Sequence, residues 1–373
     1  MKFIKTMTAV MFCVFIALFA GAFTVHAEED GSLDSYSDYI SERLDSAIDG
    51  ETSDLMRENG AEEGLDGVTP EGMITLFWER LKGSLTEPIA VLGRLAAVLI
   101  LSALMGSLAG DSAPRGFTMI SVLACITMIY RSVYGAFTLV SGYLERLLEF
   151  MLAYIPIYAS VTAASGRFTA GGSYYASALG ICELIAFVSR SVIMPFLSVF
   201  MALSFTAAID PDLHFSNAAE SVKNAVRLTL TALMTLYTGL LSVKSIAGAA
   251  ADNAASRAVK FGASSFIPII GGSVSEAYSS VYAGLGVIRS AVGSIGIAAV
   301  IFMVISPIAA LMTVKVMLEA ARVLSEMLGL TAQAELLRST SYAVSAAVST
   351  VLCFSMMFII STAVLMMAAG SGG

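Results

Sequence analysis

Long apolar runs separated by short polar breaks make up most of the chain after residue 87. A run of about 20 apolar residues is long enough to cross the hydrocarbon core of a bilayer as an α-helix. The pattern predicts an all-α polytopic membrane protein with about eight transmembrane helices. The predicted crossings are residues 88–109, 117–140, 147–164, 174–209, 226–247, 259–274, 281–311 and 342–369.

The first 27 residues have the pattern of a secretory signal peptide. Lys2 and Lys5 precede an apolar run from Met7 to Phe23, and the run is followed by a small-x-small sequence that ends at Ala27. This arrangement is typical of a cleaved export signal. An uncleaved first helix is the alternative.

Residues 28–87 form a strongly acidic segment, with 17 acidic and 4 basic side chains. Apolar residues recur in it at helical spacing. We therefore predict an extracytoplasmic segment with two amphipathic helices, which is either a solvated face or a docking surface for a basic partner and does not bind nucleic acid. The two apolar stripes are Tyr36, Tyr39, Ile40, Leu44 and Ile48, and Met73, Leu76, Phe77, Leu81 and Leu85.

The composition argues against catalytic and metal chemistry. The chain is 57% hydrophobic and 13% charged, which is far from the usage of soluble domains. Removal of the signal would leave His214 as the one histidine, and Cys125, Cys182 and Cys353 lie in apolar runs. Because a zinc site or a Ser-His-Asp relay needs more than these groups, we expect no enzyme, metal or cofactor.

Two parts of the membrane region resemble each other. Residues 154–157, with Pro156, are similar to residues 266–269, with Pro268, and Pro195 and Pro307 are separated by the same 112 positions. We predict an internal repeat, with repeat A at about 117–225 and repeat B at about 226–369. Three crossings between equivalent helices would make it inverted, as in many transporters. Chance similarity between apolar segments is the alternative.

Pro268, Gly271 and Gly272 predict a break in a membrane helix, and Pro156 predicts a second, related break. Backbone groups in hydrocarbon must be satisfied internally, so a break is tolerated only where protein or a water-filled cavity surrounds it. A broken or re-entrant helix and a plain kinked helix both fit this pattern.

Six ionisable residues lie in or beside the predicted crossings: Arg94, Arg131, Glu183, Arg190, Glu276 and Arg289. Arg94 and Arg131 can extend to the membrane interface. A charge at the bilayer centre is costly, so each of the other four is expected to face the protein interior. We predict either buried ion pairs, for example Glu276 with Arg289 or Arg190, or the lining of a polar path.

The stretch KFGASSFIPIIGGSVSEAYSSVYAGLGVIRSAVGSIGIAAVIFMVISPIAALMTVKVMLEAARVLSEMLG, residues 260–329, resembles the stage III sporulation protein AE family of endospore-forming bacteria. The order of signal peptide, acidic segment and polytopic body agrees with this family along nearly the whole chain. The family has no catalytic residues to carry over.

The resemblance implies a subunit of the channel or transport apparatus encoded with the other stage III A proteins. Such a subunit would lie in the mother-cell (outer forespore) membrane, meet a forespore membrane partner across the intermembrane space, and be required for forespore development after engulfment. A self-sufficient secondary transporter of a small solute and a structural membrane scaffold are the alternatives.

Overall fold

The computed structural model describes residues 34–65, 67–109, 115–188, 215–266 and 271–370, together with six isolated positions between 191 and 206. The described residues are helical, with turns and no strands, as the apolar pattern predicts. The predicted signal peptide lies outside the described residues.

Three short helices form the acidic segment: α2 (Asp34–Ala47), α3 (Gly50–Glu58) and α4 (Pro70–Gly83). Side-chain oxygens at the N-caps fix two of their starts. The N–H of Thr52 donates to Asp49 Oδ1 at 2.7 Å, and the N–H of Gly72 donates to Thr69 Oγ1 at 3.1 Å. Pro70 is suited to the first turn of α4 because the first N–H groups of a helix have no intrahelical acceptor.

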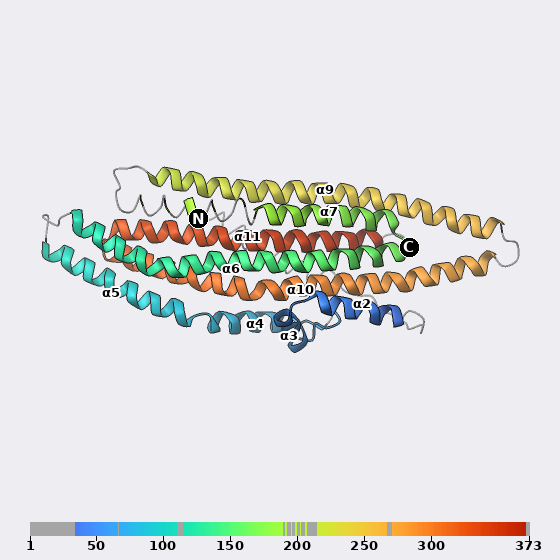
Figure 1. Ribbon diagram of the computed structural model, residues 1–373, viewed down its shortest axis with the longest axis horizontal. Coiled ribbons are helices and arrows are strands. Elements are labelled where there is room, and N and C mark those ends of the chain that lie inside the picture. The colour runs from blue at the N-terminus through green and yellow to red at the C-terminus, as the bar shows by residue number, and fades with distance from the viewer. Residues whose placement is uncertain are drawn as a thin grey trace.

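The remaining helices are α5 (Thr86–Ala109), α6 (Arg115–Ala164), α7 (Phe168–Phe187), α9 (Phe215–Phe266), α10 (Gly271–Met327) and α11 (Thr331–Gly370). They lie side by side in an elongated bundle, with α5 and α9 on its outside (Figure 1). Helices α6, α9 and α10 have 50, 52 and 57 residues. At 1.5 Å per residue each is about 75 to 85 Å long, more than twice the thickness of a hydrocarbon core.

These long helices do not confirm the prediction of eight crossings. The described residues contain five helices that are long and apolar enough to span a bilayer: Thr86–Leu108, Gly116–Ala164, Asn224–Lys244, Tyr282–Met327 and Thr331–Met367. The predicted crossings 117–140 and 147–164 both lie within α6, so the chain does not turn back between them. The polar link at Glu145 and Arg146 stays helical because both are good helix formers.

The inverted repeat is not confirmed either. Helices α6 and α9 both start at the left end of the bundle and run to the right (Figure 1). The first helices of the two predicted repeats are therefore parallel. The prediction of opposite directions depended on a turn between residues 140 and 147, where α6 is continuous.

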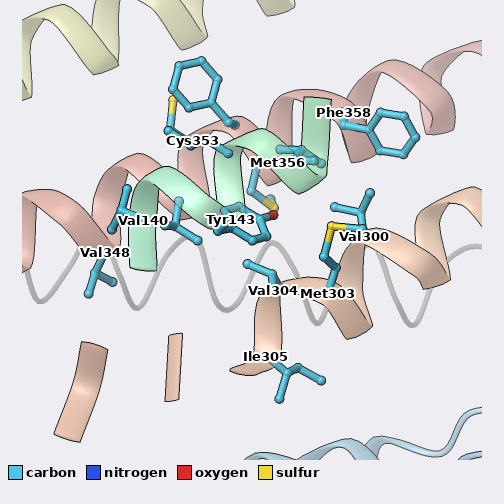
Figure 2. Packing of buried hydrophobic residues seen from close by; sticks show 14 of the residues in the cluster. Val140, Tyr143, Val300, Met303, Val304, Ile305, Val348, Cys353, Met356 and Phe358 are labelled. Atoms are coloured by element: carbon cyan, nitrogen blue, oxygen red, sulfur yellow. The ribbon is translucent and has the colours of Figure 1, made fainter. Parts of the chain in front are cut away.

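The core lies where α6, α10 and α11 meet. Figure 2 shows Tyr143 of α6 among Met303 and Val304 of α10 and Met356 of α11. The Tyr143 hydroxyl is 2.5 Å from Ser355 Oγ, so the one polar atom of this buried ring has a partner. This packing makes α10 and α11 an antiparallel hairpin with an extensive interface.

The acidic segment packs against the bundle. Ile40, Leu44 and Ile48 of its first predicted stripe are buried, as is Leu76 of the second. Helix α2 contacts α6, while α3 and α4 contact α10. The predicted amphipathic stripes are thus the faces that attach this segment to the long helices.

Candidate functional site around Arg289

Of the residues predicted to form breaks or a polar path, Arg289 is the one whose side chain the structure buries, at 7% exposure. Pro156 and Glu183 are exposed. Gly271, Gly272 and Glu276 lie in the first two turns of α10, and the surroundings of the Glu276 side chain lie outside the described part. Arg190 and Pro268 also fall outside it.

Pro156 does not break its helix. Helix α6 continues past it for two turns to Ala164. A proline inside a helix removes one backbone hydrogen bond, here to the carbonyl of Leu152. The Pro156 position is exposed, and α6 is one helix on both sides of it. The predicted break here is wrong, and the alternative of an unbroken helix with an internal proline holds.

The second predicted break falls between two helices. Helix α9 ends at Phe266 and α10 begins at Gly271. The chain therefore leaves one long helix and enters the next around the proline and the glycine pair.

The continuity of α10 rules out the predicted pair between Glu276 and Arg289. The two residues are 13 positions apart in one helix, which places their Cα atoms about 20 Å apart. Their side chains cannot bridge that distance.

Arg289 instead contacts the turn between α6 and α7. Its Nη1 donates to Ser165 Oγ at 3.3 Å, while its Nε is buried without a hydrogen-bond partner. Ser165 follows the last residue of α6, and Gly166 has a φ of +77°, which favours glycine. The N–H of Arg167 donates to the carbonyl of Thr162 at 3.3 Å and closes the helix end.

Helix α9 supplies the cap for the start of α7. The N–H groups of Thr169 and Ala170 donate to the Asp252 carboxylate at 2.9 and 2.8 Å. Asp252 is 3% exposed, and a carboxylate at a helix N-terminus also interacts favourably with the helix dipole. Beside it, Arg167 Nη1 donates to Asn253 Oδ1 at 2.5 Å.

The next two turns of α10 contact two further parts of the chain. Gly293 and Gly296 leave room for the side chains of Tyr158 and Tyr154. These rings are stacked with centroids 5.5 Å apart, and the Tyr154 hydroxyl donates to the carbonyl of Val292 at 3.1 Å. We call residues 289–296 the crossing segment.

The acidic segment reaches the crossing segment through its loop. The N–H of Leu65 donates to Ser294 Oγ at 2.9 Å, and Gly64, with a φ of +109°, packs against Ser294. A side chain at Gly64 would clash there. The crossing segment therefore joins α6, the α6–α7 turn and the acidic segment.

A second polar cluster lies on the α10–α11 hairpin, on both sides of the turn between the two helices. Arg322 contacts Glu319 at 2.8 Å and Glu326 at 2.5 Å, and Arg338 contacts Glu335 at 3.4 Å. Side-chain exposure ranges from 20% for Arg322 to 52% for Glu326. We call these five residues the charged face.

Three hydrogen bonds show which part of α5 the charged face lies beside. Ser102 of α5 and Gln333 of α11 both contact Ser121 Oγ, at 2.5 and 3.0 Å. Thr313 of α10 donates to the carbonyl of Ser84, which precedes α5, at 3.5 Å. The charged face therefore lies alongside the stretch between Ser84 and Ser102, most of it in α5, where Ile89, Ile100 and Leu101 are exposed.

The family comparison identifies the chain. The family described as Stage III sporulation protein AE matches residues 52–369. The chain belongs to the stage III sporulation protein AE family. This confirms the resemblance of residues 260–329, and the family match includes both the crossing segment and the charged face.

The chain is also similar to a stage III sporulation protein AE of Bacillus subtilis strain 168, with 22% identity over 179 residues. The similarity covers 48% of this chain and 45% of that relative, so the chain spans about half the length of the curated relative it matches. No solved structure matches the chain.

Sequence reasoning identified Arg289 but missed its surroundings. Asp252 and Asn253 lie in the second half of a long helix, and nothing near them in the sequence indicates that they meet the start of α7. One available signal was Asp252 itself, an isolated acidic residue in a small, apolar stretch. Within the described residues, no group of three or more His, Cys, Asp or Glu side chains could hold a metal ion.

Proposed function

We propose that this protein is a membrane subunit of the sporulation channel or transport apparatus that links mother cell and forespore, and that it is required for forespore development after engulfment. Membership of the stage III sporulation protein AE family supports the sporulation role. The proposal extends this role to transport through a polar path.

The charged face is the observation that carries the proposal. Its five ionisable side chains lie alongside the part of α5 where Ile89, Ile100 and Leu101 are exposed. Charges at the level of such an apolar surface in a membrane protein face protein or water, because exposure to lipid is costly. We therefore propose that the polar path follows the charged face, between this chain and its neighbours in the assembly.

The interior of the chain is a poorer candidate for the path. The space between α6, α10 and α11 is filled by stacked and edge-on aromatic rings, such as Phe150, Tyr154 and Phe358. The hypothesis of a self-sufficient transporter depended on two broken helices. One of them is absent, since α6 is continuous at Pro156.

We propose the other stage III A proteins as neighbours in the mother-cell (outer forespore) membrane, and a forespore membrane protein as the partner across the intermembrane space. In this arrangement residues 28–87 are extracytoplasmic. Their attachment to α6 and α10 would let a partner that binds them act directly on the long helices.

The test is Arg322→Met in the native spore-forming host. This change keeps an aliphatic side chain but removes the cation that pairs with Glu319 and Glu326. We expect heat-resistant spores to fall by at least about tenfold while the amount of protein in the membrane is unchanged. Arg57→Met is the matched control, because Arg57 forms an exposed ion pair with Glu62 in the acidic segment.

Normal sporulation of the Arg322→Met strain would contradict the polar path. If transport of a solute also appeared in vesicles that hold only this protein, the self-sufficient transporter would replace the proposal. Rescue by residues 28–87 on an unrelated anchor would favour the scaffold.

A further inference from the structure

Arg289 is a buried cation without a counter-ion in the described part of the chain. It is 7% exposed, its one hydrogen bond is to the neutral hydroxyl of Ser165, and its Nε has no partner. The charged side chain that acts on it is Arg167, which has the same sign. The guanidinium group stays protonated in proteins, so Arg289 cannot avoid the cost of a buried charge by losing a proton.

The acidic residues close in sequence or in space are engaged elsewhere or out of reach. The Asp252 carboxylate accepts the N–H groups of Thr169 and Ala170 and is not among the charges that act on Arg289. Glu276 is about 20 Å away along α10. An unpaired buried charge carries a large desolvation penalty, so a negative charge bound beside Arg289 would stabilise the folded protein.

We propose that Arg289 binds a small monovalent anion of the size of chloride, beside the α6–α7 turn. The Nε–H of Arg289, which has no partner among the described residues, would be a charge-assisted donor to this anion. The Tyr158 hydroxyl, which is fully buried and also without a partner, interacts electrostatically with Arg289 and supplies a second donor group in the same cluster.

The burial of the cluster limits the size of the ligand. Arg289 is 7% exposed and Tyr158 is 0% exposed, and buried charged groups at such a site favour a small ligand over an organic acid. A carboxylate of a partner protein is also a poor candidate, because it would have to reach a side chain that is more than nine-tenths buried.

The bound anion would neutralise a contact that joins three helices. Ser165 lies at the end of α6, Arg289 in α10, and Tyr158 contacts the ring of Tyr174 in α7 with centroids 5.1 Å apart. The anion therefore acts as part of the bundle, and its removal should loosen this junction.

The experiment is thermal unfolding of the purified full-length protein in detergent, in sodium chloride or in sodium gluconate at equal ionic strength. We expect chloride to raise the unfolding midpoint by about 3 to 5 °C in a saturable way, since it binds the folded state alone. Bromide should act like chloride. Arg289→Gln should lose this dependence, and Tyr158→Phe should weaken it.

Arg322→Met is the matched control, because it removes an arginine from a partly exposed ion-pair cluster and should keep the full chloride effect. If Arg289→Gln does not fold, equilibrium dialysis of the wild-type protein against radiolabelled chloride replaces it, with about one ion bound per chain expected. Equal midpoints in chloride and gluconate, or no bound chloride, would mean that water fills the site and would overturn the proposal. These readouts do not depend on sporulation, so they are independent of the charged face.

Discussion

Helices α10 and α11 and helices α5 and α9 all carry apolar stretches long enough to span a bilayer, but their surroundings differ. In the most apolar windows of α10 and α11, 72% and 78% of the helix is buried inside the protein. The corresponding values for α5 and α9 are 22% and 11%. The inner helices α10 and α11 are apolar because they form the protein core. The outer helices α5 and α9 are apolar on an exposed surface, which suits contact with membrane lipid.

This difference shows why an apolar run in the sequence does not by itself indicate a membrane crossing. A helix that is hydrophobic all round is either a membrane span or the centre of a bundle. The apolar stretch of α10 has 46 residues, twice the length that a bilayer needs. Its length reflects the partners along it, including α11, α6 and the acidic segment.

The largest expected effect is the loss of stability when a large side chain of the inner helices is replaced by alanine, compared with the same change in the outer helices. Phe358→Ala in α11 removes a fully buried ring that packs against Phe150 and Tyr154, and should destabilise the protein by about 3 to 5 kcal/mol. Leu240→Ala in α9, where the side chain is 56% exposed, should cost less than about 1 kcal/mol. Unfolding midpoints in nanodiscs would measure both, and equal losses would contradict the comparison.

A charge on an outer helix tests whether its surface faces lipid. Leu104→Lys in α5, at 55% exposure, should reduce membrane insertion at a cost of roughly 3 kcal/mol if α5 lies in hydrocarbon. Tyr39→Lys in α2, at 51% exposure, is the control and should insert normally. The inserted fraction can be measured by extraction and protease protection, and normal insertion of Leu104→Lys would exclude α5 from the lipid-facing surface.

A smaller effect is expected where the outer helix α9 joins the inner ones. Asp252→Ala removes the acceptor for the N–H groups of Thr169 and Ala170 and should cost about 1 to 3 kcal/mol. Asp252→Asn keeps one acceptor and should cost less. Hydrogen exchange at the two amides is the direct measurement, and unchanged protection in Asp252→Ala would show that another group caps α7.

The smallest expected effect is an increase in stability, whereas the changes above reduce stability or insertion. A side chain added at Gly239 of α9 meets no atom within 4 Å, so Gly239→Ala should stabilise the helix by about 0.5 to 1 kcal/mol. The same change at Gly296 of α10 should destabilise the protein, because the ring of Tyr154 occupies that space. Thermal midpoints of the two variants would compare them, and a loss of stability at Gly239 would contradict the open surface of α9.

Local patterns in the sequence predicted the elements but not their continuity. The stripe with Ile40 and Leu44 predicted a helix and the face it buries, because periodicity depends on neighbours in the chain. The link at Glu145 and Arg146 was predicted to be a turn, yet it is helical. Arg146 lies 3.4 Å from Glu51 of the acidic segment, a contact across 95 positions that no local pattern contains.

The candidate site was predictable only in part for the same reason. A charge in an apolar run is unusual, and this identified Arg289. Its partner Ser165 is 124 positions away, and the capping residue Asp252 is 83 positions from Thr169. Those contacts depend on how the long helices are arranged, and the predicted turn between residues 140 and 147 gives α6 a different course.

The hydrogen bond between Leu65 and Ser294 joins residues that are 229 positions apart. Ribosomes add about 5 to 20 residues per second. Ser294 is therefore synthesised roughly 10 to 45 s after Leu65. During that interval the buried residues of the acidic loop, such as Ala61 and Leu65, have no surface to cover them. A chaperone or assembly partner can therefore bind this loop before α10 is synthesised. It must dissociate before α10 packs against the loop.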